Sequence, residues 1–350
     1  MDQPSNPAAV IPPRKRISRR TALRLALLAG IGAGAAYAEY STRPVGIARY
    51  LAWLARGNVQ RLTAPPARVA LGQCPSYADD VLACLRETWD AAGMPDVRDK
   101  RVFVKPNLID AIEGYPITTA PQVVAAVVDL LRERGAGEIA VGDGPGFRRD
   151  ALPVAKAAGL TEVLIQRQVP FVDLNYDDPR PVVAKDGWFP HLREIWLPRH
   201  VREADLIISV PKLKTHHWAG VTLSLKNLFG IVPGARYGWP KNVLHFNGIT
   251  PSILGLYQTV RPLVAVVDGI IGMEGDGPLF GSAVPHGLLA VGADPVAVDT
   301  MCARLMGFVL ADVQHLQLAD WAGLGRATRI EIAGTATDVL WRNYRRPPHG

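Results

Sequence analysis

Residues 206–230 read LIISVPKLKTHHWAGVTLSLKNLFG. The apolar run at 206–210 predicts a buried strand, and the apolar residues at helical spacing within 221–229 predict a buried helix. The stretch holds three lysines and no arginine, although the whole chain has thirty arginines and only nine lysines. An ammonium is a compact point charge, whereas a guanidinium is a planar fork. Lysines grouped between a buried strand and a buried helix therefore indicate an anion-binding site rather than a solvated surface.

From Ala67 onward, apolar runs alternate with segments of helical periodicity. The predicted strands are 69–72, 102–104, 138–141, 206–210 and 263–267, and the predicted helices are 77–92, 121–134, 150–158, 252–260 and 295–306. Strands that are apolar throughout are typical of a parallel sheet covered on both faces. We therefore expect an α/β fold with a mostly parallel sheet, helices on both faces and a short β-rich excursion at 171–203.

Polar side chains follow the carboxyl ends of four predicted strands. They are Lys105 with Asn107, Asp143 in a glycine-rich run, the lysines before His216, and Asp268. These ends share one edge of a parallel sheet, where ligands bind. We expect one site for a small carboxylate or phosphate, although ordinary turn chemistry remains the alternative for each pair taken alone. The predicted substrate-binding residues are Lys105, Asn107, Asp143, Lys226 and Asn227.

Lys212, Lys214 and His216 alternate along an extended segment and so share one face of it. We assign the catalytic roles to these three residues. His216 is the candidate general base, and the two lysines would offset developing negative charge. His217 would point to the opposite face, so we expect one of the two histidines to serve the site.

A second acidic run, DGIIGMEGDGP, occupies residues 268–278. Its carboxylates are spaced by glycines, and carboxylate oxygens suit a hard divalent cation such as Mg²⁺. The spacing is not that of an EF-hand, and a polar surface turn is the alternative. No P-loop or G-x-G-x-x-G pattern is present, so nucleotide binding is not predicted. The predicted metal ligands are Asp268, Glu274 and Asp276.

The N-terminal segment, residues 1–38, carries most of the positive charge: about +5 of the formal +7. Arg19 and Arg20 form a twin-arginine pair, an apolar run follows at 25–38, and Ala-Tyr-Ala at 36–38 offers a cleavage site. We expect export by the twin-arginine machinery to the periplasm, with an uncleaved membrane anchor facing the periplasm as the alternative. Membrane contact would then involve this segment alone. No basic stripe lies elsewhere, so nucleic acid is not an expected partner.

Beyond the signal, we expect a peripheral helix and linker at 39–66, one α/β domain at 67–335, and a tail at 336–350. Residues 231–248, rich in aromatic residues, Pro and Gly, would form a lid over the ligand. Cys74, Cys84 and Cys302 form no C-x-x-C motif, so no zinc or iron–sulfur framework is expected. The pair Cys74 and Cys84 is consistent with either a disulfide or two buried thiols.

Several motifs together resemble the family of domains of unknown function 362 (DUF362), which are uncharacterised α/β proteins. The resemblance spans about residues 100–310 and implies an α/β domain without naming a reaction. Some relatives carry ferredoxin-like cysteine modules, which this chain lacks, so their redox associations transfer poorly. The matching segments are VKPNL at 104–108, TTAP at 118–121, VGDGPG at 141–146, SVPKLKTH at 209–216, VTLSLKNLFG at 221–230, VDGIIGMEGDGP at 267–278 and GADPVAVD at 292–299.

The leading hypothesis is an exported enzyme that acts on a small carboxylate or phosphate, with a divalent cation as the candidate cofactor. The same lysines suit a non-catalytic protein that binds an anion or assists cofactor assembly. A third hypothesis is an iron–sulfur-associated redox partner. The residues leave the substrate and the reaction open.

Overall fold

The computed structural model describes residues 63–146, 150–184, 193–260 and 262–348, together with positions 55, 57 and 59. The chain separates into two units, 1–52 and 53–350, and the description below concerns the second. The predicted signal segment, including the twin-arginine pair, and most of the predicted peripheral helix lie outside the described residues. Among the residues that are described, no helix combines the length and the apolar character needed to cross a membrane.

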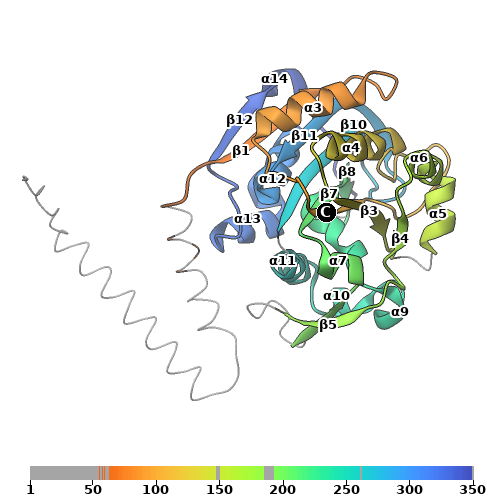
Figure 1. The fold of residues 1–350 in the computed structure, drawn as a ribbon. Coiled ribbons are helices and arrows are strands. Elements are labelled where there is room, and N and C mark those ends of the chain that lie inside the picture. The colour runs from red at the N-terminus through yellow and green to blue at the C-terminus, as the bar shows by residue number, and fades with distance from the viewer. Residues whose placement is uncertain are drawn as a thin grey trace, which may run out of the picture. The chain divides into compact units, whose positions relative to one another are not determined.

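A ten-stranded mixed sheet forms the centre of the fold, in the order β12-β1-β11-β10-β7-β2-β3-β4, with β8 paired to β10 and β9 paired to β8 (Figure 1). The segment from β10 to β4 is parallel throughout. The strands are β1 (Ala67–Gln73), β2 (Arg101–Pro106), β3 (Glu138–Asp143), β4 (Phe171–Asp173), β7 (Leu206–Val210), β8 (Lys212–His216), β9 (Gly220–Thr222), β10 (Leu263–Glu274), β11 (Ser282–Gly292) and β12 (Ile330–Gly334). The prediction of a mostly parallel sheet is confirmed.

Strand β11 is the main departure from the expected pattern. It runs antiparallel to both β10 and β1. The sequence did not predict it because its first half contains Pro285 and Gly287, which disfavour a strand prediction, and only four apolar residues at 288–291 follow them. Pairing with the long strand β10 stabilises β11, whose own sequence does not favour a strand.

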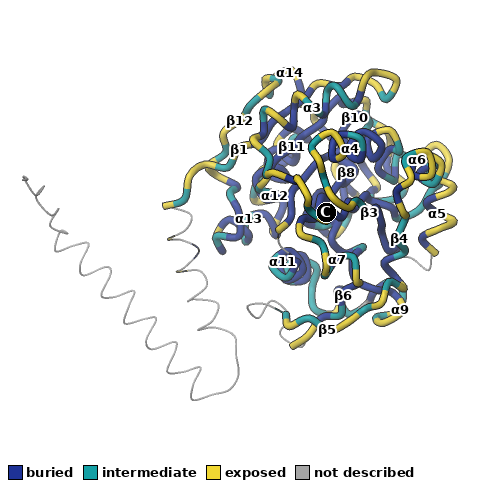
Figure 2. Tube along the Cα trace, viewed as in Figure 1, coloured by how far each residue is buried: buried dark blue, intermediate teal, exposed yellow. Residues whose placement is uncertain are grey.

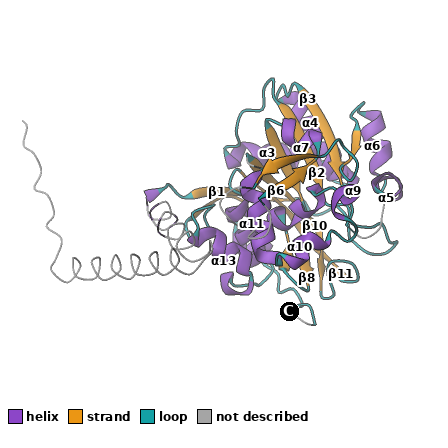
Figure 3. Ribbon diagram, turned by 90° about the horizontal axis from the view of Figure 1, so that it is seen from below, coloured by secondary structure: helices purple, strands orange, loops and turns teal. Residues whose placement is uncertain are grey.

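Helices cover both faces of the sheet, as expected (Figure 3). Side chains of β2 alternate between two apolar clusters: Phe103 belongs to one, and Val102 and Val104 belong to the other. The second cluster contains residues of α3 (Val81–Ala92), α4 (Pro121–Glu133), α5 (Ala151–Ala157) and α6 (Leu160–Gln166). The first contains residues of α7 (Arg199–Glu203), α8 (Ser224–Asn227), α11 (Ile249–Thr259), α12 (Pro295–Leu305), α13 (Gln314–Trp321) and α14 (Thr337–Leu340).

The helix starts follow local sequence signals. Pro121 and Pro295 each occupy the first turn of a helix, where a missing N–H costs nothing. Asp294 caps α12 by accepting hydrogen bonds from the N–H groups of Val296 and Ala297, at 3.0 and 3.2 Å. The strands and these helices are largely buried along the trace (Figure 2).

The two irregular segments contain more structure than their sequences indicate. In the predicted excursion, β5 (Arg180–Val183) and β6 (Glu194–Leu197) form a separate antiparallel pair, whereas β4 joins the edge of the main sheet. The predicted lid contains the end of the 3₁₀ helix η1 (Leu228–Ile231) and two short helices, α9 (Gly234–Tyr237) and α10 (Asn242–Phe246). A second 3₁₀ turn, η2 (Leu310–Asp312), precedes α13. All three cysteines are free thiols.

Candidate functional site

A cavity of about 410 Å³ lies beyond the carboxyl ends of β2, β3 and β8. The structure brings seven of the predicted site residues to its wall, from segments spread over 170 positions of the chain. They are Lys105, Asn107, Asp143, His216, Lys226, Asn227 and Asp276. Four predicted site residues do not line it: Lys212, Lys214, Asp268 and Glu274. Parallel strands thus gather one group of polar side chains at a common edge.

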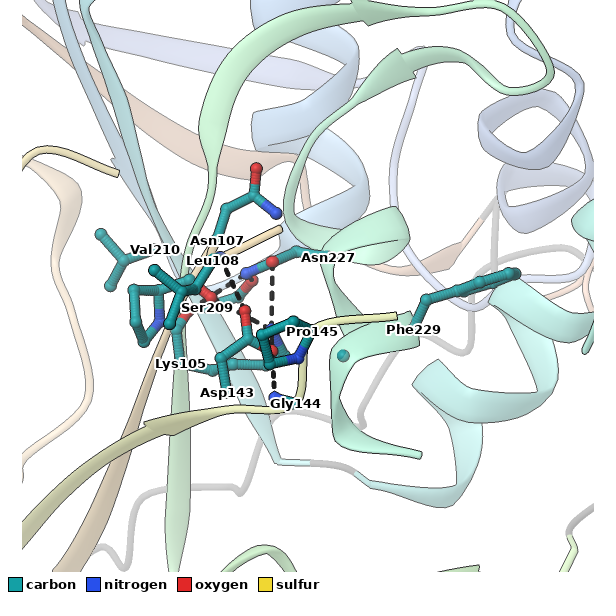
Figure 4. A network of polar contacts seen from close by, with 12 residues as sticks. Lys105, Asn107, Leu108, Asp143, Gly144, Pro145, Ser209, Val210, Asn227 and Phe229 are labelled. Atoms are coloured by element: carbon teal, nitrogen blue, oxygen red, sulfur yellow. Dashed lines mark hydrogen bonds and ion pairs between the residues drawn. The ribbon is translucent and has the colours of Figure 1, made fainter. Parts of the chain in front are cut away.

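Lys105 and Asp143 form a buried ion pair at the cavity wall, with 2.7 Å between Nζ and Oδ1 (Figure 4). The Asp143 carboxylate also accepts hydrogen bonds from the N–H groups of Leu108 and Gly144, both at 2.7 Å. Burial lowers the pKa of Lys105, and the Asp143 charge opposes that shift. The Asp143 carboxylate is therefore fully engaged inside the protein.

Asn227 ties this pair to the neighbouring strands. Its Oδ1 accepts a hydrogen bond from Lys105 Nζ at 3.2 Å. Its Nδ2 donates to the carbonyl of Lys105 and to Ser209 Oγ, both at 3.1 Å. The amide is saturated by these bonds, so Asn227 positions Lys105 and α8 rather than offering a free donor to a ligand.

Gly230 makes room for the Lys105–Asp143 pair. A Cβ at this position would overlap Asp143 Oδ1 and would lie 2.5 Å from Lys105 Nζ. Any larger residue would push the ammonium and the carboxylate apart. The glycine after the 221–229 segment is thus required by close approach of the backbone to a charged pair.

Lys212 and Asp268 form a second buried pair, at 3.1 Å. Tyr77 links the two partners: its hydroxyl donates to Asp268 Oδ1 at 2.8 Å and accepts from Lys212 Nζ at 2.5 Å. The N–H of Ala120 donates to the other carboxylate oxygen at 2.8 Å. This network joins β8 and β10 beside the cavity without lining it.

Lys214 is fully buried without a carboxylate partner. Its Nζ donates to the carbonyls of Ile117 and Pro278, at 2.7 and 3.2 Å. Burial, together with the charges of Lys226 and Lys212, lowers the pKa of Lys214 well below its ordinary value. The three alternating residues of β8 therefore have three different surroundings, and only His216 reaches the cavity.

The ring of His216 is oriented by the backbone. Its Nδ1 lies 3.1 Å from the N–H of Trp218 and 3.3 Å from the N–H of Ala219, so Nδ1 accepts and Nε2 carries the proton. Burial lowers the pKa of His216 well below its ordinary value, and the charge of Lys226 adds to this effect. His216 thus presents a neutral N–H donor. His217 also lines the cavity, although alternation along a strand would point it to the opposite face.

Lys226 lies on α8, whose first turn is held by Asp299. The Asp299 carboxylate accepts hydrogen bonds from the N–H groups of Ser224 and Leu225, both at 2.9 Å. This buried carboxylate thus satisfies the start of the helix. Lys226 Nζ lies 3.8 Å from the centre of the Phe229 ring. No acceptor for its N–H groups is found among the described residues.

The surroundings of Lys226 disfavour its charged form. Burial, reinforced by the nearby charge of Lys105, lowers the pKa of Lys226 to about 7. The charge of Lys226 in turn contributes to the lowered pKa values of His216, His245 and His315, which places these histidines within its electrostatic reach. Lys226 is therefore a half-buried amine in a basic neighbourhood, with its charged and neutral forms of similar weight near pH 7.

Sequence reasoning placed Lys241 and His245 only within a lid and gave them no role. Lys241 Nζ donates to the carbonyls of Gly144 and Gly230, at 2.6 and 3.2 Å, so its ammonium fixes the glycine-rich turn after β3 to the end of η1. Burial lowers its pKa to about 7. The one lysine of the segment 231–248, directly after Trp239-Pro240, was the available signal.

Several polar atoms around the cavity have no partner among the residues that the structure describes. Asn107 Oδ1, Thr222 Oγ1 and His245 Nδ1 are buried and make no hydrogen bond. The Asn107 amide points away from the Lys105–Asp143 network in Figure 4. Buried polar groups are normally satisfied, so unpartnered groups that line one cavity indicate a ligand that would satisfy them.

The three carboxylates predicted to bind a metal do not converge. Asp268 is buried with Lys212. Glu274 accepts from the N–H of Arg345 at 2.8 Å and faces the guanidinium of the same residue. Asp276 is exposed at the cavity rim. Across the described part of the chain, no group of three or more His, Cys, Asp or Glu side chains has the arrangement of a metal site.

Comparisons with known proteins identify similar sequences and structures. The family described as "Domain of unknown function (DUF362)" matches residues 102–304. A thylakoid-associated protein of Synechocystis sp. is 32% identical over 280 residues, which cover 78% of this chain and 82% of the relative.

Two solved structures are more distantly similar, each 15% identical over 71% of this chain. One is the lactate racemase apoprotein from Thermoanaerobacterium thermosaccharolyticum, with a TM-score of 0.44 and 58% of that chain covered. The other is a protein from Thermotoga maritima, with a TM-score of 0.40 and 60% covered. The present chain spans less than two thirds of either structure.

Proposed function

The chain belongs to the DUF362 family, whose description assigns no reaction, and we propose that its cavity binds a small organic anion, a carboxylate or a phosphate. The observation that carries this proposal is the ammonium of Lys226, which faces the cavity with no acceptor among the described residues. Of the two carboxylates that line the cavity, Asp143 is neutralised by Lys105, and Asp276 is exposed. A half-buried cation with no counter-ion among the described residues favours an anionic ligand.

Three kinds of group would hold the ligand. The Nε2–H of His216 and the amide of Asn107 are hydrogen-bond donors, and Lys226 supplies the charge. Trp218, Phe229 and other apolar residues of the wall would contact an apolar part of the ligand. His216 serves here as a donor and not as the general base expected from the sequence, because its basic nitrogen already accepts backbone N–H groups.

The protein is expected to take up protons when it binds an anion, and its affinity for the anion is expected to fall with rising pH. The pKa of Lys226 in the free protein is about 7. A bound anion favours the ammonium, so the affinity falls as the pH rises through that value and the amine loses its proton. Titration calorimetry with propionate, benzoate and phenyl phosphate at pH 6 and pH 8, in two buffers of different ionisation enthalpy, measures both effects.

Matched variants locate the binding site. Lys226→Met is expected to weaken binding at pH 6 by roughly ten- to a hundredfold, the value of a charge-assisted hydrogen bond. His216→Asn keeps an acceptor near the Nδ1 position and removes the Nε2–H, so we expect up to about tenfold weaker binding. Lys156→Met removes an exposed lysine and should leave affinity unchanged. Equal affinities for all four proteins, or no binding of any anion, would refute the proposal.

We also propose that the protein is exported or associated with a membrane. The relative from Synechocystis sp. is thylakoid-associated, and the twin-arginine pair precedes an apolar run in this chain. In a bacterial host, the unmodified protein should fractionate with the periplasm or membrane. Replacing Arg19 and Arg20 by lysine should retain it in the cytoplasm, whereas the same change at Arg14 and Arg16 should not. Identical fractionation of both double variants would exclude twin-arginine export.

A further inference from the structure

We propose that Lys226 forms an imine with the ligand, which is therefore an anion that carries a carbonyl group, such as a 2-oxo acid. This inference rests on the proposed anion-binding function and names the ligand class of the same cavity. It depends on how Lys226, which is half-buried at the cavity wall, differs from the buried lysines of the described residues.

Those other lysines each have defined acceptors. Lys105 and Lys212 are paired with carboxylates, and Lys214 and Lys241 donate to backbone carbonyls. An ammonium held by acceptors cannot approach a carbonyl carbon without losing them. Lys226 faces the cavity, contacts the ring of Phe229 and has no hydrogen bond to lose. Its nitrogen is thus the amine of the cavity that is free to attack.

The surroundings of Lys226 also favour the uncharged form of its amine. Desolvation in an apolar pocket and a neighbouring cation are the two ways in which proteins turn a lysine into a nucleophile. Both act on Lys226. Burial and the charge of Lys105 lower its pKa to about 7. A substantial fraction of the side chain is therefore uncharged at neutral pH, whereas an exposed lysine is almost wholly protonated.

The reaction balances without any further co-reactant. The Nζ lone pair attacks the carbonyl carbon while the carbon–oxygen π electrons move to oxygen. One proton then passes from the nitrogen to that oxygen, which gives a carbinolamine. With one proton from solvent the hydroxyl leaves as water, and the nitrogen lone pair forms the protonated imine. The Nε2–H of His216, within the electrostatic reach of Lys226, would hydrogen-bond the developing oxyanion.

A carboxylate beside the carbonyl completes the charge balance. The protonated imine keeps the positive charge of Lys226, so the acid group retains a cationic neighbour after the bond forms. The Thr222 hydroxyl, without a partner among the described residues, remains to donate to a carboxylate oxygen. The apolar wall at Phe229 and Leu279 would accept the side chain of the acid.

Borohydride trapping tests the inference. The protein is incubated with 2-oxobutyrate or phenylpyruvate, reduced with sodium borohydride and analysed by intact mass and peptide mapping. We expect one adduct per chain, located at Lys226, and slower trapping in excess propionate, which occupies the site but has no carbonyl. Lys156→Met should be labelled like the unmodified protein, and Lys226→Arg, which keeps a positive charge, should not.

The outcomes separate the two proposals. Calorimetric binding of 2-oxobutyrate without an adduct overturns the imine and leaves anion binding intact. Neither binding nor an adduct overturns both. Adducts spread over exposed lysines in the unmodified protein, unaffected by propionate, also overturn the imine, and this result does not depend on the folding of any variant.

Discussion

Replacing Asp143 by asparagine is expected to lower the free energy of unfolding by about 3–5 kcal/mol, the cost of leaving one partner of a buried ion pair without the other. Asp143 and Lys105 are 2% and 0% exposed, so water cannot take the place of the lost carboxylate. The same oxygens accept two backbone N–H groups, which adds to the loss. Urea unfolding at pH 7 measures the change.

The control is a carboxylate-to-amide change in an exposed pair. Glu133 faces Arg86 at 2.8 Å, and both side chains are 42% exposed. Glu133→Gln should leave the free energy of unfolding nearly unchanged, because surface ion pairs contribute little. The double variant Lys105→Met, Asp143→Asn should recover part of the loss, since it removes the unpaired ammonium. An Asp143→Asn effect no larger than that of Glu133→Gln would show that the pair does not hold the two strand ends together.

Lys226→Met is expected to make the free protein more stable by about 1–3 kcal/mol at pH 6 to 7, because it removes a half-buried amine that has no acceptor among the described residues. The gain should shrink as the pH rises towards 10. The folded pKa of Lys226, about 7, lies below the ordinary value of 10.5, so between these values the unfolded chain binds the extra proton. Stability of the unmodified protein therefore rises with pH across that window, and below it the deficit is constant.

Thermal or urea unfolding of the two proteins at pH 6, 7, 8 and 9 gives the difference curve. Lys241 contributes a slope of the same sign to both proteins, and because the charge of Lys226 lowers the pKa of Lys241, the difference reports Lys226 together with this coupling. Lys156→Met should give a flat difference near zero. A Lys226→Met variant that is less stable at every pH would mean that the ammonium contributes to the fold, and the site would then lack the uncompensated charge that anion binding requires.

Much of the sheet could be predicted because its signals are local. The runs around Phe103, Val141 and Ile208 are apolar throughout, as central parallel strands require, and proline or aspartate marks the helix starts. The prediction that polar side chains gather at one edge of the sheet follows from the direction of the strands alone. By contrast, β11 forms through its pairing with β10, and no local sequence pattern predicts it.

The roles of individual site residues were less predictable. Alternation placed Lys212, Lys214 and His216 on one face, but each meets a different neighbour, and the lysines turn to Asp268 and to backbone carbonyls. Glycine-spaced carboxylates suggested a metal site, but Asp268 is committed to Lys212, and Glu274 to Arg345. The spacing of residues along the chain does not show which group will pair with each side chain in the folded protein.

The sequence by itself determined that lysines, an asparagine and a carboxylate follow apolar strands, because strand polarity and side-chain period are properties of short segments. Only the tertiary structure decided which lysine ammonium is paired with a carboxylate. Lys105 meets Asp143 across 38 residues, and Lys212 meets Asp268 across 56. Such pairings depend on the packing of distant segments and on the desolvation that packing imposes, and they leave Lys226 as the charge that faces the cavity without a partner among the described residues.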